Sequence, residues 1–184
     1  MSYLESLFSL DGKISIVTGA ARGNGKSISE ALLRSGSTVI LIDVLKKELL
    51  KTVKKFQDEN LPAIEYYCDI TKKKQISDLG KYIKKNFGRL DILVNNAGIT
   101  LSDSSLDYSE KFWDKTNDVN IKAPFFLSQE CAKIMKLKKS GIIINITSIN
   151  AEFAFPDNPS YQVSKAGLKQ LTKSLSLDLE IGRA

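Results

Sequence analysis

Short apolar runs alternate with amphipathic segments along the whole chain. Most of the runs are nearly continuous in Val, Ile and Leu, which is typical of strands buried on both faces of a parallel sheet. They predict strands at 14–18, 38–43, 63–68, 91–95 and 142–147. Helical apolar spacing between the runs predicts helices at about 24–35, 45–60, 72–87, 109–138 and 160–180. This alternation implies right-handed βαβ crossovers and therefore a doubly wound α/β sheet.

Glycine and proline mark several of the predicted boundaries. Gly36 and Gly88 each follow a predicted helix, where a glycine commonly ends it. Pro124 falls inside the longest helical segment and is expected to break it, because proline has no N–H to donate. No linker, repeat or low-complexity segment interrupts the pattern, so we expect residues 1–184 to form a single domain.

Composition removes several classes of function. The 184 residues are 42% hydrophobic and 26% charged, as in ordinary globular proteins. There is no histidine, which excludes Ser-His-Asp and Cys-His nucleophiles and histidine metal sites, and we expect no bound metal. Cys68 and Cys131 have no CxxC partner, so they are expected to be reduced thiols in the core of a cytoplasmic protein.

Charge and hydropathy argue against two kinds of partner. The formal net charge is +6, but the lysines are scattered over the predicted helices as on solvated faces, and no aromatic residues interleave with them. We therefore expect no nucleic-acid binding. No apolar run approaches the ~18–20 residues of a membrane span. The N-terminus lacks the basic and apolar regions of a secretion signal, so we expect no membrane association.

The first predicted strand runs directly into a glycine-rich turn, and a predicted helix follows. Glycines let the backbone turn tightly and approach a pyrophosphate, and the start of a helix presents free N–H groups to the phosphates. The segment therefore predicts a dinucleotide-binding loop, the alternative being a purely structural turn. The residues assigned to the cofactor here are Thr18, Gly19, Arg22, Gly23, Asn24 and Gly25.

Carboxylates follow the next two strands. Asp43 ends the second strand, where a carboxylate would accept hydrogen bonds from the adenosine ribose and repel a 2′-phosphate. Arg22 favours the opposite choice, since a guanidinium beside the loop would hold that phosphate. We give Asp43 more weight and expect NAD, with NADP as the alternative cofactor. Asp69 and Ile70, after the third strand, are expected to contact the adenine; turn formation is the alternative role for both aspartates.

A second group of residues has the chemistry of an acid–base site. Tyr161 and Lys165 are four residues apart on a predicted helix, so both side chains leave one face about a turn apart. A nearby ammonium favours the phenolate of a tyrosine, although such a pair alone is also common on helix surfaces. Ser148 ends the fifth strand, at the edge where open α/β sheets bind ligands. Asn120 begins a helical stretch, and 95–98 close the fourth strand.

At this set of residues the chain resembles the short-chain dehydrogenase/reductase family. The matching positions keep the family's order and approximate spacing over essentially the whole chain: Thr18–Gly25, Asp69, Asn95–Gly98, Asn120, Ser148 and Tyr161–Lys165. The resemblance implies a Rossmann-type sheet with helices on both faces, in the strand order 3-2-1-4-5 and without the family's last two strands. The fifth strand would then be an open sheet edge. It also implies a homodimer or homotetramer built by the helices near 121–138 and 160–180, whose apolar stripes are equally explained by core burial.

The resemblance assigns catalytic roles as well. Tyr161 would be the general acid/base, and Lys165 would favour its phenolate and hold the nicotinamide ribose. Ser148 would orient the substrate oxygen, and Asn120 would hold a water that links Lys165 to solvent. The other residues that it assigns to the cofactor are Asn96, Ala97 and Gly98. The implied reaction interconverts a secondary alcohol and a ketone on a small substrate, sugar-derived or acyl, by hydride transfer with NAD(P).

Two departures from the family pattern leave an alternative open. Asn24 stands where the family usually has Ile or Leu, which predicts weakened packing beneath the glycine loop. The chain also ends soon after the Tyr161 helix, well short of the family's usual length. The opening segment 7–13 and the loop before Tyr161 look most like gluconate 5-dehydrogenases. The alternative to an active oxidoreductase, which the two departures leave open, is a truncated, inactive protein with a nucleotide-binding or subunit-interaction role.

Overall fold

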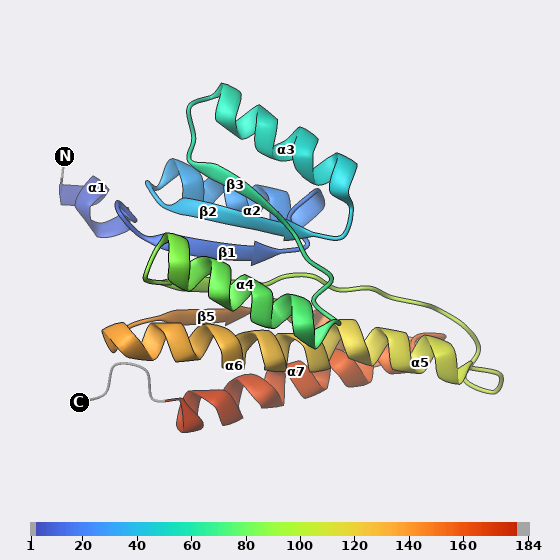
Figure 1. The fold of residues 1–184 in the computed structure, drawn as a ribbon. Coiled ribbons are helices and arrows are strands. Elements are labelled where there is room, and N and C mark those ends of the chain that lie inside the picture. Colours follow the sequence, from blue (N-terminus) through green and yellow to red (C-terminus); the bar gives the residue numbers. More distant parts are fainter. Residues whose placement is uncertain (1–2, 180–184) are drawn as a thin grey trace.

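The computed structural model describes residues 3–179, and within them a single parallel sheet forms the centre of the molecule (Figure 1). Its strands are β1 (Ile14–Thr18), β2 (Thr38–Asp43), β3 (Ala63–Tyr67), β4 (Ile92–Asn95) and β5 (Ile142–Asn145). They pair in the order β3-β2-β1-β4-β5, and every pair is parallel. The expected doubly wound Rossmann-type sheet is therefore confirmed, and its order reverses between β1 and β4.

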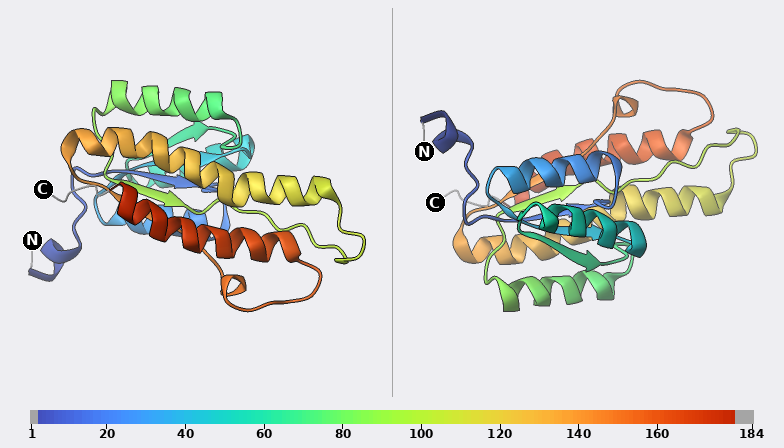
Figure 2. Two further views of the ribbon diagram at one scale, coloured as in Figure 1. Left: turned by 90° about the horizontal axis from the view of Figure 1, so that it is seen from below. Right: turned by 90° about the horizontal axis from the view of Figure 1, so that it is seen from above.

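Helices cover both faces of this sheet (Figure 2). The helices are α1 (Tyr3–Phe8), α2 (Gly23–Arg34), α3 (Lys46–Asp58), α4 (Lys73–Asn86), α5 (Glu110–Asn117), α6 (Ala123–Met135) and α7 (Pro159–Asp178). Of these, α1 and α5 lie beyond the ends of the sheet instead of on a face (Figure 1). Gly36 and Gly88 adopt left-handed conformations, with φ of 99° and 65°, just beyond α2 and α4. These positions are where glycine was expected to end the helices. Within residues 3–179, no helix has both the length and the apolar character that crossing a membrane requires.

Alternating side chains of the strands supply two separate cores. Val17 on β1 packs with residues of α2 and α3, whereas its neighbour Ile16 packs with residues of α4 and α6. Residues of β1, β2 and β4 are buried almost throughout, as predicted for central parallel strands. The fifth strand differs: Ile142 and Ile144 are 58% and 44% exposed, while Ile143 packs toward α6. Within residues 3–179, β5 pairs with β4 alone, so the sheet edge expected at β5 is present.

The break expected near Pro124 lies just before it. A single π-helical turn (Asp118–Lys122) joins α5 to α6, and Pro124 is the second residue of α6. Proline has no N–H, so the backbone carbonyl of Asn120 loses the donor that an uninterrupted α-helix would provide.

The apolar stripes of α6 and α7 are partly core. Ile134, Leu168 and Leu175 are buried, whereas Leu137, just after α6, is 62% exposed. Core burial therefore explains much of both stripes, and the homodimer or homotetramer stays a prediction.

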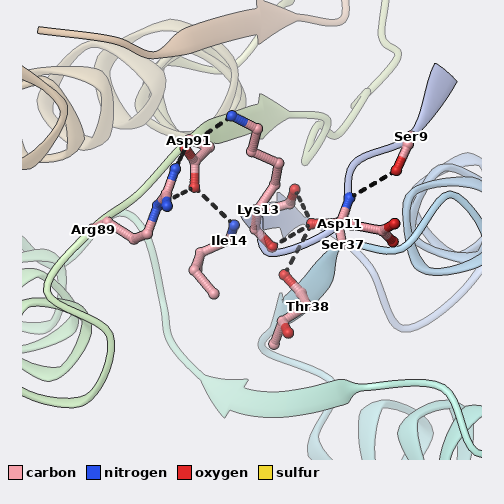
Figure 3. Close-up of polar contacts among 9 residues, drawn as sticks. Ser9, Asp11, Lys13, Ile14, Ser37, Thr38, Arg89 and Asp91 are labelled. Atoms are coloured by element: carbon pink, nitrogen blue, oxygen red, sulfur yellow. Dashed lines mark hydrogen bonds and ion pairs between the residues drawn. The ribbon is translucent and has the colours of Figure 1, made fainter. Parts of the chain in front are cut away.

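At the amino ends of the strands, Asp91 joins β1 to β4 (Figure 3). Its Oδ2 accepts hydrogen bonds from the N–H of Ile14 and from Nε of Arg89, both at 2.9 Å. Nζ of Lys13 lies 3.8 Å from Oδ1. Burial alone would raise the pKa of Asp91, but the hydrogen bonds from Arg89 and Ile14, together with the charges of Arg89 and Lys13, hold that pKa below its usual range.

Candidate active site

A cleft of about 1270 Å³ opens at the carboxyl ends of β1 to β4. This is larger than the roughly 300–1,000 Å³ typical of small-molecule pockets, as an extended ligand requires. Its lining includes every residue that the sequence assigned to the cofactor except Tyr161 and Lys165: Thr18, Gly19, Arg22, Gly23, Asn24, Gly25, Asp43, Asp69, Ile70, Asn96, Ala97 and Gly98. Segments far apart in the sequence therefore converge on one cavity.

The glycine loop of this cleft has no room for a side chain at Gly19 or Gly25. Gly19 and Gly23 adopt left-handed conformations, with φ of 63° and 56°. A Cβ on Gly25 would lie 2.2 Å from the carbonyl oxygen of Gly19, so no side chain fits there. Helix α2 begins at Gly23, and Arg22 at its N-cap gives no side-chain hydrogen bond. The first N–H groups of α2 are therefore free to bind an anion such as a phosphate.

Thr18 and Asn96 join the loop after β1 to the loop after β4. Oγ1 of Thr18 accepts hydrogen bonds from the N–H groups of Asn96, at 3.1 Å, and Ala97, at 3.0 Å. In return, Nδ2 of Asn96 donates to the carbonyl of Thr18 at 2.9 Å. These polar groups maintain the shape of the cleft floor.

Both candidate cofactor aspartates also organise turns. Asp43 is 9% exposed; its Oδ2 accepts from the N–H of Ala21 and its Oδ1 from the N–H of Leu45, each at 3.0 Å. Oδ1 of Asp69 accepts from both the N–H and the hydroxyl of Thr71, at 3.0 and 2.7 Å. Each carboxylate keeps lone-pair capacity beyond these bonds, at Oδ2 in the case of Asp69, so turn formation and ligand binding are compatible.

Asn24 does not bury its amide beneath the glycine loop, and the weakened packing expected there stays a prediction. The side chain of Asn24 is exposed and lines the cleft instead of lying beneath the glycine loop. An exposed amide bonds to water, so the cost of an unpaired buried group does not arise.

Lys165 lies directly behind the cleft wall formed by Gly98. Its side chain is buried, with the residue 4% exposed, and Nζ donates to the carbonyl of Ile146 at 2.8 Å. A Cβ on Gly98 would lie 3.4 Å from Nζ of Lys165 and from Oδ1 of Asn120. Burial lowers the pKa of Lys165. One turn earlier on α7, the half-buried ring of Tyr161 has its centroid 5.8 Å from the same Nζ.

Asn120 uses its side-chain amide within the protein. Its Oδ1 accepts from the N–H of Ile99 at 2.9 Å, and its Nδ2 donates to the carbonyl of Ile99 at 2.9 Å and to Oγ of Ser164 at 3.1 Å. The hydroxyl of Ser164 donates to the carbonyl of Tyr161 at 2.7 Å. Sequence reasoning missed Ser164, although a small polar residue between Tyr161 and Lys165 on the same helix was a usable signal.

Ser148 follows β5 and caps a short turn. It is half-buried, and its Oγ accepts from the N–H of Asn150 at 3.2 Å at the start of a 3-10 turn (Ile149–Ala151). Within residues 3–179, the hydroxyls of Ser148 and Tyr161 make no hydrogen bond to each other. The structure thus brings Asn120, Tyr161 and Lys165 together, and it places Ser148 just after β5, in the loop that leads to α7.

The face of α5 is a part of the cleft that sequence reasoning missed. Charged residues at helical spacing on α5 and just after it line the cleft: Glu110, Lys111, Asp114, Lys115 and Asp118. Such a charge pattern is typical of a solvated outer face, and only the position of α5 beyond the sheet places it against a cavity.

Comparison with known proteins agrees with this geometry. The short chain dehydrogenase family profile matches residues 13–182. The chain is 34% identical over 172 residues to the 3-oxoacyl-(acyl-carrier-protein) reductase FabG of Thermotoga maritima, covering 92% of this chain and 69% of the relative. It is 36% identical over 172 residues to the gluconate 5-dehydrogenase of Gluconobacter oxydans, covering 94% of this chain and 67% of the relative.

A solved structure is also similar along nearly the whole chain. A gluconate 5-dehydrogenase from Burkholderia cenocepacia, in complex with NADP and tartrate, superposes with a TM-score of 0.92 at 28% identity, covering 98% of this chain and 71% of that one. The chain thus spans roughly two thirds of the length of its relatives. With the fold, the cleft and these matches in agreement, the chain belongs to the short chain dehydrogenase family of NAD(P)-dependent oxidoreductases.

Proposed function

We propose that this chain interconverts a secondary alcohol and a ketone on a small substrate, with Tyr161 as the general acid/base. One observation supports the assignment most strongly. Tyr161 stands one helical turn before a buried cationic side chain, Lys165, immediately behind the cleft residue Gly98. An ammonium held close to a phenol favours its ionised form, which otherwise requires a pH near ~10.

The residues of the cleft fit a dinucleotide. The uncapped start of α2 and the loop with no room for a side chain at Gly25 would hold the pyrophosphate. Asp43 would accept hydrogen bonds from the adenosine ribose, and Asp69 and Ile70 would contact the adenine. When bound, the nicotinamide ring supplies or accepts the hydride.

Tyr161 on α7 transfers the proton, and Ser148, which follows β5, orients the substrate oxygen. In the reductive direction, Oη of Tyr161 gives its proton to the substrate oxygen, and the hydroxyl of Ser148 donates a hydrogen bond to that oxygen as negative charge develops. The charge of Lys165 stabilises the phenolate left behind. In the oxidative direction, the phenolate takes the proton back.

The role proposed for Asn120 falls on its backbone. Both amide protons of its side chain are already donated, to Ile99 and Ser164. Because Pro124 provides no N–H, the carbonyl of Asn120 is the group that would accept a hydrogen bond from a water leading to Lys165.

We propose NAD as the preferred cofactor. The carboxylate of Asp43 lines the cleft and would repel a 2′-phosphate, whereas the exposed cations Arg22 and Lys72 on the same cleft would attract one. Replacing Asp43 with Ala should shift the ratio of NADPH to NADH affinity by roughly tenfold toward NADPH, the effect of one charged contact. An unchanged ratio would remove Asp43 from the choice of cofactor.

The substrate that we propose is a polyol or keto acid derived from a sugar, on the similarity to gluconate 5-dehydrogenases. An acyl substrate is the alternative, on the similarity to FabG. Rates of NADH and NADPH oxidation with a keto-gluconate and a 3-oxoacyl thioester distinguish them.

The decisive variant is Tyr161→Phe, with Tyr82→Phe on α4 as the matched control. Loss of the phenol should lower kcat by ~100-fold or more, as expected for a lost general acid, while cofactor affinity stays within a few-fold. Full activity in Tyr161→Phe would overturn the assignment. Cofactor binding without turnover of any ketone by the unaltered chain would favour the nucleotide-binding or subunit-interaction role instead.

A further inference from the structure

The segment between β4 and α5, residues 99–109, extends past the carboxyl end of the sheet and lies beside the start of α7 (Figure 2). Hydrogen bonds join the two. Oγ1 of Thr100 donates to Oδ1 of Asn158 at 3.0 Å, and the N–H of Asp103 donates to the carbonyl of Asp157 at 3.0 Å. These residues are more than fifty positions apart, so the contact belongs to the tertiary structure of the active-site end.

A chain of two hydroxyls strengthens this contact. The hydroxyl of Tyr108 donates to the carbonyl of Leu101, and it lies 2.5 Å from Oγ of Ser160. A phenol has one proton, so the hydroxyl of Ser160 must be the donor to Tyr108. The ring of Tyr108 meets the ring of Phe112 on α5 edge-on, with centroids 6.3 Å apart. The ring of Tyr108 therefore packs against α5, while its hydroxyl bonds to Ser160 on α7.

The first turn of α7 depends on such outside contacts. The side chain of Asn158, the N-cap, accepts from Thr100 and caps no N–H of the helix, and Asp157 before it is left-handed, with φ of 58°. The initial N–H groups of any helix lack partners within the helix. Ser160 is completely buried in this turn and directly precedes Tyr161. The next turn is fixed separately, through the hydrogen bond from Lys165 to Ile146.

We propose that Tyr108 is a positioning residue for Tyr161. Through Ser160, it holds the first turn of α7 so that the phenol of Tyr161 keeps its place relative to Lys165 and the substrate. The inference rests on the proposed function, because it assumes that Tyr161 transfers the proton. The hydroxyl of Tyr108 bonds to Leu101 and Ser160, so Tyr108 acts on Tyr161 only through Ser160.

The test compares Tyr108→Phe, Ser160→Ala and the double variant with Tyr82→Phe. Tyr82 is a good control because it is also half-buried, packs against Tyr66, and its hydroxyl makes no hydrogen bond within residues 3–179. Amide hydrogen exchange in residues 162–166 should be roughly tenfold faster in both single variants, about the effect of one hydrogen bond, and unchanged in α4. With an active ketone, kcat should fall by a similar factor of about ten while KM stays nearly constant.

The double variant should be no worse than Tyr108→Phe, because the bond that Ser160→Ala removes is already lost when the hydroxyl of Tyr108 is absent. The inference would be overturned if Tyr108→Phe showed the same exchange rates and kcat as Tyr82→Phe. It would also be overturned if the effects of the two single variants added fully in the double variant. If Tyr161→Phe is inactive and Tyr108→Phe behaves normally, only this inference fails. If Tyr161→Phe keeps its activity, the proposed function fails, and the exchange data alone decide whether Tyr108 holds the turn.

Discussion

The two ends of the central sheet use their polar groups in opposite ways. At the amino ends of the strands, Asp91 meets Arg89, Lys13 and the N–H of Ile14 (Figure 3). At the carboxyl ends, the start of α2 has no side-chain cap, and Arg22 is exposed in an open cleft. One end satisfies its charges internally and stabilises the fold, while the other leaves donors available to a ligand.

Buried charge shows the same contrast. The partners of Asp91 lower the pKa of its carboxyl group, so its ionised form stabilises the folded state. Lys165 makes no ion pair within residues 3–179, and Nζ bonds a neutral carbonyl. Burial lowers the pKa of Lys165 because the charged form is the one destabilised. A charge that costs stability yet stands beside Tyr161 is expected at a functional site.

The largest effect is expected from a glycine substitution at the carboxyl end of the sheet. Gly25→Ala would place a Cβ 2.2 Å from a backbone oxygen and displace the loop. We expect NADPH and NADH binding to weaken by ~100-fold or more, a typical result of misplacing a binding group. Gly88→Ala is the matched control, because a Cβ there meets open space although φ is 65°. It should cost about 1 kcal/mol of stability and leave cofactor affinity unchanged, as titration calorimetry and denaturation would show. Equal losses of affinity would contradict the contrast.

Removal of Asp91 should give the next largest effect. Asp91→Ala leaves the N–H of Ile14 without its acceptor and should lower the free energy of unfolding by about 2 kcal/mol at neutral pH. The lost ion pair with Arg89 contributes little to this figure, because the side chain of Arg89 is half-exposed. The folded pKa is below the unfolded value, so this stability is present above about pH 4 and is lost as pH falls through the folded pKa. The variant should therefore lose less stability than the unaltered chain on acidification. Asp58→Ala, on the exposed end of α3, is the control.

The smallest change in stability is expected for Lys165→Met, and this variant should be more stable than the unaltered chain, whereas Asp91→Ala should be less stable. Activity should be lost, but removing an unpaired buried charge should raise the free energy of unfolding by about 1 kcal/mol at neutral pH. In the unaltered chain the cost of this charge disappears as pH rises through the lowered folded pKa of Lys165, so the difference should shrink at alkaline pH. Denaturation at two pH values measures it. A less stable variant at neutral pH would show that Lys165 stabilises the fold.

The fold and the cofactor cleft were readable from the sequence because local patterns determine them. Apolar runs fix buried parallel strands, and glycines at the end of a strand fix a loop that only backbone can form. The exposure of the Asn24 side chain could not be predicted, because its direction depends on how the loop meets α2.

The supporting hydrogen bonds were not readable. Ser164 bonds Asn120 across 44 positions, and Tyr108 meets Ser160 across 52. The periodicity of apolar residues within a segment does not indicate contacts between such distant positions. The charged face of α5 has the pattern of a surface helix, although it lines the cleft.

The contrast between the two ends is tested most directly by amide hydrogen exchange with and without saturating NADH or NADPH. Added cofactor should slow exchange in residues 18–25, 43–45, 96–99 and 159–166, at the carboxyl end of the sheet. Exchange in residues 9–14 and 88–91, at the amino end, should change little beyond any global stabilisation. Protection confined to the amino end, or none anywhere at saturating concentrations of both cofactors, would contradict the placement of the active site.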